Sequence, residues 1–217
     1  MNQNLNEYFS RIKAGGTSAG NYFETRADGT VRLIGTATSW QDIVNDLFSK
    51  RLYSTVGKVD YEEAENAIKF QSGGSITEPN DRVGGNLEIN HFLKVGNGII
   101  FKPHLHWFQD VVSGVVKPFK MTMMYRLQRN NQAKVTTWTN ITATAGTDDV
   151  FDFTGEADGT YNQLTRFSDI TVDCGVSDTF QYKIARTDTE TGDMLVYFAD
   201  FHAMVDSFGS DEEFIKL

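Results

Sequence analysis

The stretch Met121-Thr122-Met123-Met124-Tyr125-Arg126-Leu127 decides the fold class of this chain. Every second residue from Met121 to Leu127 is apolar or aromatic, so these side chains share one face of an extended strand. The segment Phe180-Gln181-Tyr182-Lys183-Ile184 repeats the pattern. Alternation between an apolar and a polar face is typical of antiparallel sheets that pack on one side. The two stretches therefore predict a protein with antiparallel sheets.

Segments of similar character continue from about Ala64 almost to the end of the chain. We expect strands at Asn66–Phe70, Asn86–Leu93, Gly98–Phe108, Phe119–Gln128, Val135–Ala143, Phe167–Asp173, Phe180–Ala185 and Met194–Val205. The connections between them are rich in Gly, Asn, Asp and Ser, which favour turns. Roughly eight short strands with few prolines predict a mainly β protein. The preferred architecture is an antiparallel β-sandwich of the jelly-roll type, with a barrel as the alternative.

The first 20 residues carry a different signal. Their apolar residues Leu5, Tyr8, Phe9 and Ile12 fall at helical spacing, so we expect a short helical or extended arm. A helix this short is marginal in water and needs its own core or a partner to pack against. The glycine-rich segment 15–20 follows as a flexible joint. The predicted organisation is an N-terminal arm or anchor over residues 1–20 and a jelly-roll domain over residues 21–217.

Two further elements are expected directly after the arm. The runs Tyr22–Arg26 and Thr30–Ile34 flank Asp28-Gly29, a pair that favours a tight turn, so they predict a β-hairpin. Ser39 can cap a brief helix that runs to Leu47, because Trp40, Ile43, Val44 and Leu47 recur at helical spacing.

Composition and charge exclude several classes of protein. Asp and Glu number 29 against 20 Lys and Arg, which gives a formal charge of −9. Nucleic-acid binding by counterion release needs clustered Lys and Arg, so we expect no nucleic-acid partner. Cys174 is the one cysteine of the sequence, which excludes an intramolecular disulfide framework and a multi-cysteine zinc site. No run approaches the roughly 18 apolar residues of a membrane span, and Met1–Lys13 lacks the core of a signal peptide.

The stretch Lys102-Pro103-His104-Leu105-His106-Trp107 is the most conspicuous candidate site. His104 and His106 are two residues apart on a predicted strand, so both rings project from the same face. Ile100, Lys102 and Phe108 belong to that face too. A face that mixes His, Lys and Phe indicates an interface or a ligand groove. The residues that we assign to this candidate cluster are His104, His106, His202, His91 and Trp107.

The same stretch also admits a metal site. Paired imidazoles are a common start for one, and the spacing from Gly98 resembles the opening of the first cupin motif. In a cupin-like metal-dependent enzyme, His202 would be the distal ligand. However, Asp110 stands where a cupin would carry Glu, and the cation of Lys102 would disfavour a metal ion. We therefore assign no catalytic residue, metal or cofactor, and keep this enzyme as an alternative interpretation.

Several short motifs occur in an order that resembles a known group of proteins. They are Ser39-Trp40-Gln41-Asp42, Asn90-His91-Phe92, Pro103-His104-Leu105-His106-Trp107, Tyr125-Arg126-Leu127-Gln128 followed by Asn130-Asn131, then Trp138, Asp200-Phe201-His202 and Asp206-Ser207-Phe208-Gly209-Ser210. Their order is similar to that in tailed-bacteriophage virion structural proteins, which include head-decoration and fibre-like proteins. The resemblance extends from about Thr38 to Lys216.

The resemblance implies a β-jelly-roll subunit of the virion surface, assembled in the cytoplasm of a bacterial host. It would form a homotrimer and bind the major capsid protein or another virion protein. The arm residues that would anchor it to the capsid are Leu5, Tyr8, Phe9 and Ile12. Three linked arms bind more tightly than one, because the effective concentration is high. A further interpretation is a carbohydrate- or receptor-binding module of a tail fibre, with Trp138, Tyr161 or Tyr53 stacking on sugar rings.

Overall fold

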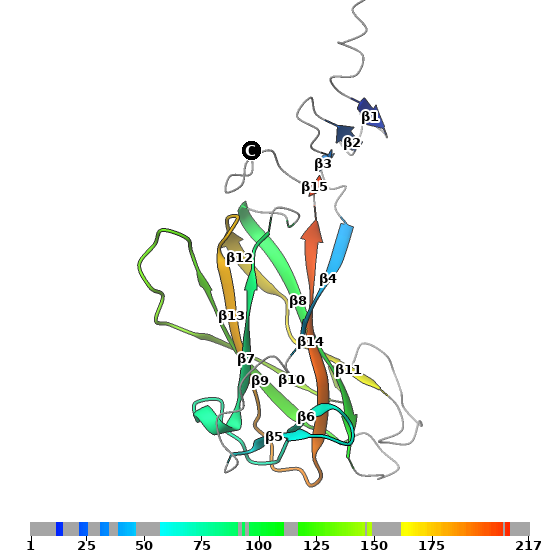
Figure 1. Ribbon diagram of the computed structural model, residues 1–217, viewed down its shortest axis with the longest axis vertical. Helices are drawn as coiled ribbons and strands as arrows, with labels where there is room; N and C mark the ends of the chain where they lie inside the picture. Colours follow the sequence, from blue (N-terminus) through cyan, green and yellow to red (C-terminus); the bar gives the residue numbers. More distant parts are fainter. Residues whose placement is uncertain are drawn as a thin grey trace, which may run out of the picture.

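The computed structural model describes residues 12–14, 22–25, 31–34, 39–46, 57–90, 93, 96–110, 117–145, 147–148, 162–205 and 207–208 (Figure 1). Within these ranges the chain forms antiparallel β-strands and a short 3-10 helix, η3 (Pro79–Asp81). No helix in this part of the chain is long and apolar enough to cross a membrane. The prediction of a mainly β protein is confirmed.

Two packed sheets form the body of the molecule. Their principal strands are β6 (Ala67–Phe70), β7 (Val83–Glu88), β8 (Gly96–Gln109), β9 (Lys120–Gln128), β10 (Thr139–Thr144), β12 (Ile170–Cys174), β13 (Thr179–Arg186) and β14 (Met194–Val205). One sheet has the order β10-β9-β13-β7, and in the opposite sheet β12, β8, β14 and β6 lie side by side in that order. The chain crosses from one sheet to the other at each connection from β6 to β9, again between β10 and β12, and at each connection from β12 to β14. This arrangement is an eight-stranded jelly roll, as the alternation predicts.

Further strands extend the sheet that contains β8. β11 (Gln163–Arg166) pairs with β8 beside β12, and β5 (Val59–Glu62) pairs with β6 at the edge. The sequence did not predict either of them. Three predicted strands are shifted: β7 begins at Val83 rather than at Asn86, β10 begins at Thr139 rather than at Val135, and β12 begins at Ile170 rather than at Phe167.

Aromatic side chains from both sheets meet in the core between them. Phe101 of β8 stacks on Phe180 of β13, with 5.4 Å between ring centroids. Phe201 of β14 contacts Phe180 at 5.7 Å and Tyr182 at 4.9 Å. Each fully buried side chain of this kind contributes about 1.5–3 kcal/mol relative to exposure. Phe180, Tyr182 and Ile184 are all buried, which confirms the face predicted from their alternation.

A glycine of β7 makes room for one of these aromatic rings. A Cβ at Gly85 would lie 2.6 Å from the Tyr182 hydroxyl and 2.7 Å from its ring carbons. Gly85 and Tyr182 are partners in the β7–β13 register. A side chain at position 85 would therefore displace the ring, which explains a glycine inside a strand.

The helix predicted from Ser39 to Leu47 is wrong. Residues Ser39–Asp46 form β4, which pairs antiparallel with β14 over the whole length from Ser39↔Val205 to Asp46↔Phe198. Ile43 packs against the core, whereas the next residue, Val44, is 57% exposed. Neighbouring side chains on opposite faces are typical of a strand, in which side chains alternate. Each residue of the segment has a register partner in β14. A short isolated helix is less stable than this pairing, so the segment forms a strand.

A small sheet involves residues from both ends of the chain. It has the order β1 (Ile12–Ala14), β2 (Tyr22–Thr25), β3 (Val31–Ile34) and β15 (Ser207–Phe208). The predicted hairpin is confirmed, since β2 and β3 pair antiparallel. Figure 1 shows this sheet beyond the end of β14, away from the sandwich. Ile12 begins β1, so the expected helix does not include it; Leu5, Tyr8 and Phe9 lie outside the described residues.

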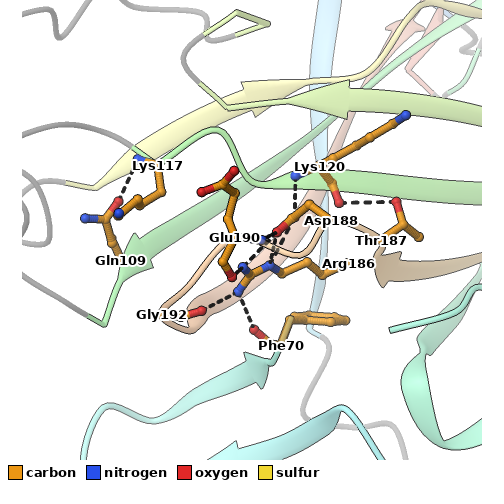
Figure 2. Close-up of polar contacts among 9 residues, drawn as sticks. All are labelled: Phe70, Gln109, Lys117, Lys120, Arg186, Thr187, Asp188, Glu190 and Gly192. Carbon is orange, nitrogen blue, oxygen red and sulfur yellow. Dashed lines mark hydrogen bonds and ion pairs between the residues drawn. The ribbon is translucent and has the colours of Figure 1, made fainter. Parts of the chain in front are cut away.

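Arg186 joins several segments at the end of β13 (Figure 2). Its guanidinium pairs with Asp188 at 2.8 Å and donates to the carbonyl oxygens of Phe70 at 3.2 Å and Gly192 at 2.6 Å. It also donates to the carbonyl oxygen of Glu190 at 2.5 Å. The Arg186 side chain is fully buried. The network therefore ties the connection between β13 and β14 to β6, and the sequence did not predict it.

Candidate functional site

β8 carries the candidate histidines through the middle of the larger sheet. Phe101, Leu105 and Trp107 are fully buried on its inner face. His104 and His106 alternate with them and therefore project from the outer face, as predicted. Because the inner face of β8 is packed with apolar side chains, a site built on these histidines lies outside the sandwich core.

The register between β8 and β14 brings two distant motifs together. The pairs are Phe198↔His106, Asp200↔His104 and His202↔Lys102. A register shift between Val196 and Phe198 precedes them. Partners in an antiparallel pair share a face, so Asp200 and His202 stand on the outer face beside His104.

His104 contacts both residues from β14. Its Nε2 lies 3.4 Å from Oδ2 of Asp200, and the two side chains are 5% and 6% exposed. The ring of His202 meets that of His104 edge-on, with 4.6 Å between centroids. On the other side of the ring, Nδ1 of His104 lies 3.5 Å from the carbonyl oxygen of Lys102. The structure therefore brings His104, Asp200 and His202 into one compact group.

His106 lies at the edge of this group. Its ring centroid is 5.1 Å from that of His104 but 4.4 Å from that of Phe198. Its Nδ1 lies 3.4 Å from Nδ2 of Asn162. His106 thus contacts Phe198 of β14 and Asn162, the residue before β11.

Opposing effects act on the pKa of the Asp200 carboxyl group. Burial raises its pKa, but the hydrogen bond and charge of His104 and the backbone amide of Phe201 outweigh it and lower the pKa below the ordinary value. Its second oxygen, Oδ1, is buried and has no hydrogen-bond partner in the structure. Such an orphaned buried oxygen costs free energy and calls for a physical explanation.

One described member of the predicted cluster lies elsewhere. Trp107 is buried on the inner face, where its indole Nε1 donates to Oγ1 of Thr165 at 2.9 Å and its ring contacts Phe119. It therefore belongs to the core. His91 lies outside the described residues. Asp200 was not in the predicted cluster, although its alternation with His202 was a signal for it.

Trp138, the aromatic candidate for sugar stacking, has cationic neighbours. The guanidinium carbon of Arg126 is 4.4 Å from the ring centroid, and Nζ of Lys183 is 3.9 Å from it. Burial lowers the pKa of Lys183. The ring is thus already engaged in cation–π contacts. The other two aromatic candidates, Tyr161 and Tyr53, lie outside the described residues.

Comparisons with known proteins provide partial structural likenesses. No family model and no curated protein matches the chain. Among solved structures, the mosquito-larvicidal Cry4Aa toxin from Bacillus thuringiensis matches at 9% identity with a TM-score of 0.43, over 79% of this chain and 26% of the toxin chain. Dimeric latent PorU from Porphyromonas gingivalis matches at 8% identity with a TM-score of 0.31, over 91% of this chain and 18% of that chain. The chain thus spans about a quarter of the first structure and less than a fifth of the second.

Proposed function

We propose that this protein is a structural subunit of a tailed-bacteriophage virion, a capsid decoration or head-fibre protein that forms homotrimers. One observation carries the proposal. The motifs Pro103–Trp107 and Asp200–His202, which underlie the resemblance to such proteins, lie on paired strands in matching register. The residues that carry the resemblance thus lie next to one another in the fold.

The outer face of the larger sheet supports self-association. Val44 is 57% exposed there, and further apolar or aromatic residues on β8 and β14 are partly exposed: Ile100, Phe108, Tyr197, Phe198 and Met204. The outer face of a solvated antiparallel sheet is normally polar. Exposed apolar side chains on such a face favour protein interaction. We infer that copies of this chain pack on one another through this face, in a closed threefold arrangement.

The N-terminal arm supplies the proposed contact with the capsid. Its described part, β1, pairs with β2 in the small sheet that also contains β15. That sheet lies beyond the end of the sandwich in Figure 1. An arm in this position can bind a shell while the outer face of the sandwich remains available for neighbouring copies.

Deletion of Met1–Gly20 tests the anchoring. Full-length and shortened protein are mixed with capsids of the phage that encodes them and sedimented. We expect the full-length chain to sediment with the capsids and the shortened chain to stay in the supernatant. Circular dichroism should show the same β spectrum for both. Equal binding of the two chains would contradict the anchor, and failure of the full-length chain to bind would contradict the proposed function.

A further inference from the structure

We propose that His104, Asp200 and His202 form a binding site for one divalent transition-metal ion, with Zn²⁺ as the best-fitting ion. One ligand atom from each of the three side chains lies within 4.8 Å of the other two. Imidazole nitrogens with a carboxylate oxygen are a ligand set that suits zinc and its neighbours, whereas Mg²⁺ and Ca²⁺ prefer oxygen ligands. The site would lie within one chain and bridge β8 and β14.

The spacing of the first two ligands fits such an ion. Zinc bonds to nitrogen and carboxylate oxygen are about 2.0–2.2 Å long, so two ligands of a tetrahedral site are about 3.4 Å apart. His104 Nε2 and Asp200 Oδ2 lie 3.4 Å apart. The third ligand, His202, is half-buried and contacts the ring of His104, so a small side-chain movement brings it to the ion.

A second observation points to a missing ligand at this place. Oδ1 of Asp200 is buried without a hydrogen-bond partner. The side chain that carries it is 6% exposed. A cation held by both oxygens of this carboxylate would satisfy Oδ1 as well as Oδ2, whereas the contact with His104 involves Oδ2 alone. The geometry thus explains why a polar group is kept at a buried position on this face.

The surroundings of His104 also match those of a metal ligand. A histidine that binds a metal through one nitrogen commonly donates its other N–H to a backbone carbonyl, which fixes the ring. Nδ1 of His104 faces the carbonyl oxygen of Lys102 at 3.5 Å, while Nε2 faces Asp200. On metal binding, Nε2 would exchange its hydrogen bond to Asp200 for a bond to the ion, and Nδ1 would hold the proton that faces the Lys102 carbonyl.

Charge at the site must also permit a cation. Lys102 stands opposite His202 in the β8–β14 register and opposes binding. Arg166 of β11 is in register with His104 on β8 and is likewise basic. The carboxylate of Asp200, which faces His104 directly, supplies the negative charge at the site itself.

Cobalt and zinc titrations of the untagged full-length protein test the site. Co²⁺ bound in a tetrahedral site with nitrogen ligands gives visible d–d absorption, and Zn²⁺ should displace it at one ion per chain. The ligand variants are Asp200→Asn and His202→Gln, and the matched control is His106→Gln. We expect the ligand variants to bind about tenfold more weakly or worse, and the control to bind like the wild type.

Three results of these titrations would overturn the proposal. The first is the absence of saturable binding of Co²⁺ and Zn²⁺ by the full-length chain. The others are binding that survives in both ligand variants and binding that is lost equally in His106→Gln. If Asp200→Asn does not fold, His202→Gln decides alone, because position 202 is half-buried. Metal binding needs one chain only, so its failure and the failure of trimer formation are read independently.

Discussion

Burial determines the chemistry of Cys174 at the end of β12. The thiol is buried, and this burial, followed by the charge of Asp178, raises its pKa to about 11. At pH 8 such a thiol is thiolate in roughly one molecule in a thousand, and thiolate is the reactive form. We expect native protein to react with a disulfide reagent far more slowly than urea-unfolded protein at pH 8. Native labelling as fast as that of the unfolded chain would contradict the buried position.

Arg186 is expected to contribute more to stability than a surface arginine. In Arg186→Lys, the carbonyl oxygens of Phe70 and Gly192 lose a donor, and Asp188 loses its paired fork. Removing one partner from a buried ion pair costs about 3–5 kcal/mol; Lys keeps the positive charge but not the planar fork of donors, so we expect the free energy of unfolding to fall by about 2–4 kcal/mol. Urea unfolding of wild type and variant measures this difference in the free energy of unfolding.

The matched control is Arg166→Lys. Arg166 pairs with Asp169 at 2.6 Å, but these side chains are 47% and 37% exposed. Exposed pairs contribute about 1 kcal/mol or less, so this variant should unfold almost like the wild type. Equal losses at positions 166 and 186 would show that the buried network does not have the proposed role.

For single residues, the sequence predicts which face of a strand a side chain occupies better than it predicts which residues that side chain contacts. Alternation placed His104 and His106 on one face of β8, because the period of a strand is a local property. The contact between His104 and Asp200 depends on the register of two strands that are far apart in the chain. No local pattern encodes that register, so Asp200 joined the candidate site only in the structure.

β4 shows how an element can be mistaken when its partner is unknown. The spacing of Trp40, Ile43 and Val44 fits a helix as well as a short irregular strand. Intrinsic propensity is a weak prior for so short a segment, and pairing with β14 decides its conformation. The strand assignment makes the neighbours Ile43 and Val44 inequivalent.

Threonine substitutions test the assignment of β4. Ile43 packs against the core, so Ile43→Thr should lower the free energy of unfolding by about 1–3 kcal/mol. Val44 is 57% exposed, and Val44→Thr should change the free energy of unfolding by less than about 0.5 kcal/mol. Denaturant unfolding of the two variants gives the comparison. Similar losses at both positions would favour a helix with both residues on its buried side.

For the whole molecule, the two-sheet architecture is predictable because it follows from the inner faces of the strands. Alternating apolar residues on β9 and β13 place Met121, Met123, Phe180 and Tyr182 in one core. Turn residues help as well: Gly73 and Gly192 adopt positive φ angles of 71° and 92° in predicted connections. The sequence does not predict the long-range contacts, such as the pairing of the edge strands β5 and β11 and the Arg186 network.

Self-association is the property of the whole molecule on which the proposed function depends. An antiparallel sandwich with partly exposed apolar side chains on its outer face buries more apolar surface when copies combine. Threefold symmetry closes such an assembly without leaving a growing end. The molar mass in solution therefore bears directly on the account.

Light scattering coupled to size-exclusion chromatography measures this mass on untagged, full-length protein at micromolar concentration. The account predicts a single species of about 73 kDa, three times the chain mass of 24.4 kDa. Val44→Asp, which places a charge on the exposed outer face, should shift the mass toward that of one chain while the β spectrum is retained. A wild-type protein that elutes as one species of 24.4 kDa would contradict the account.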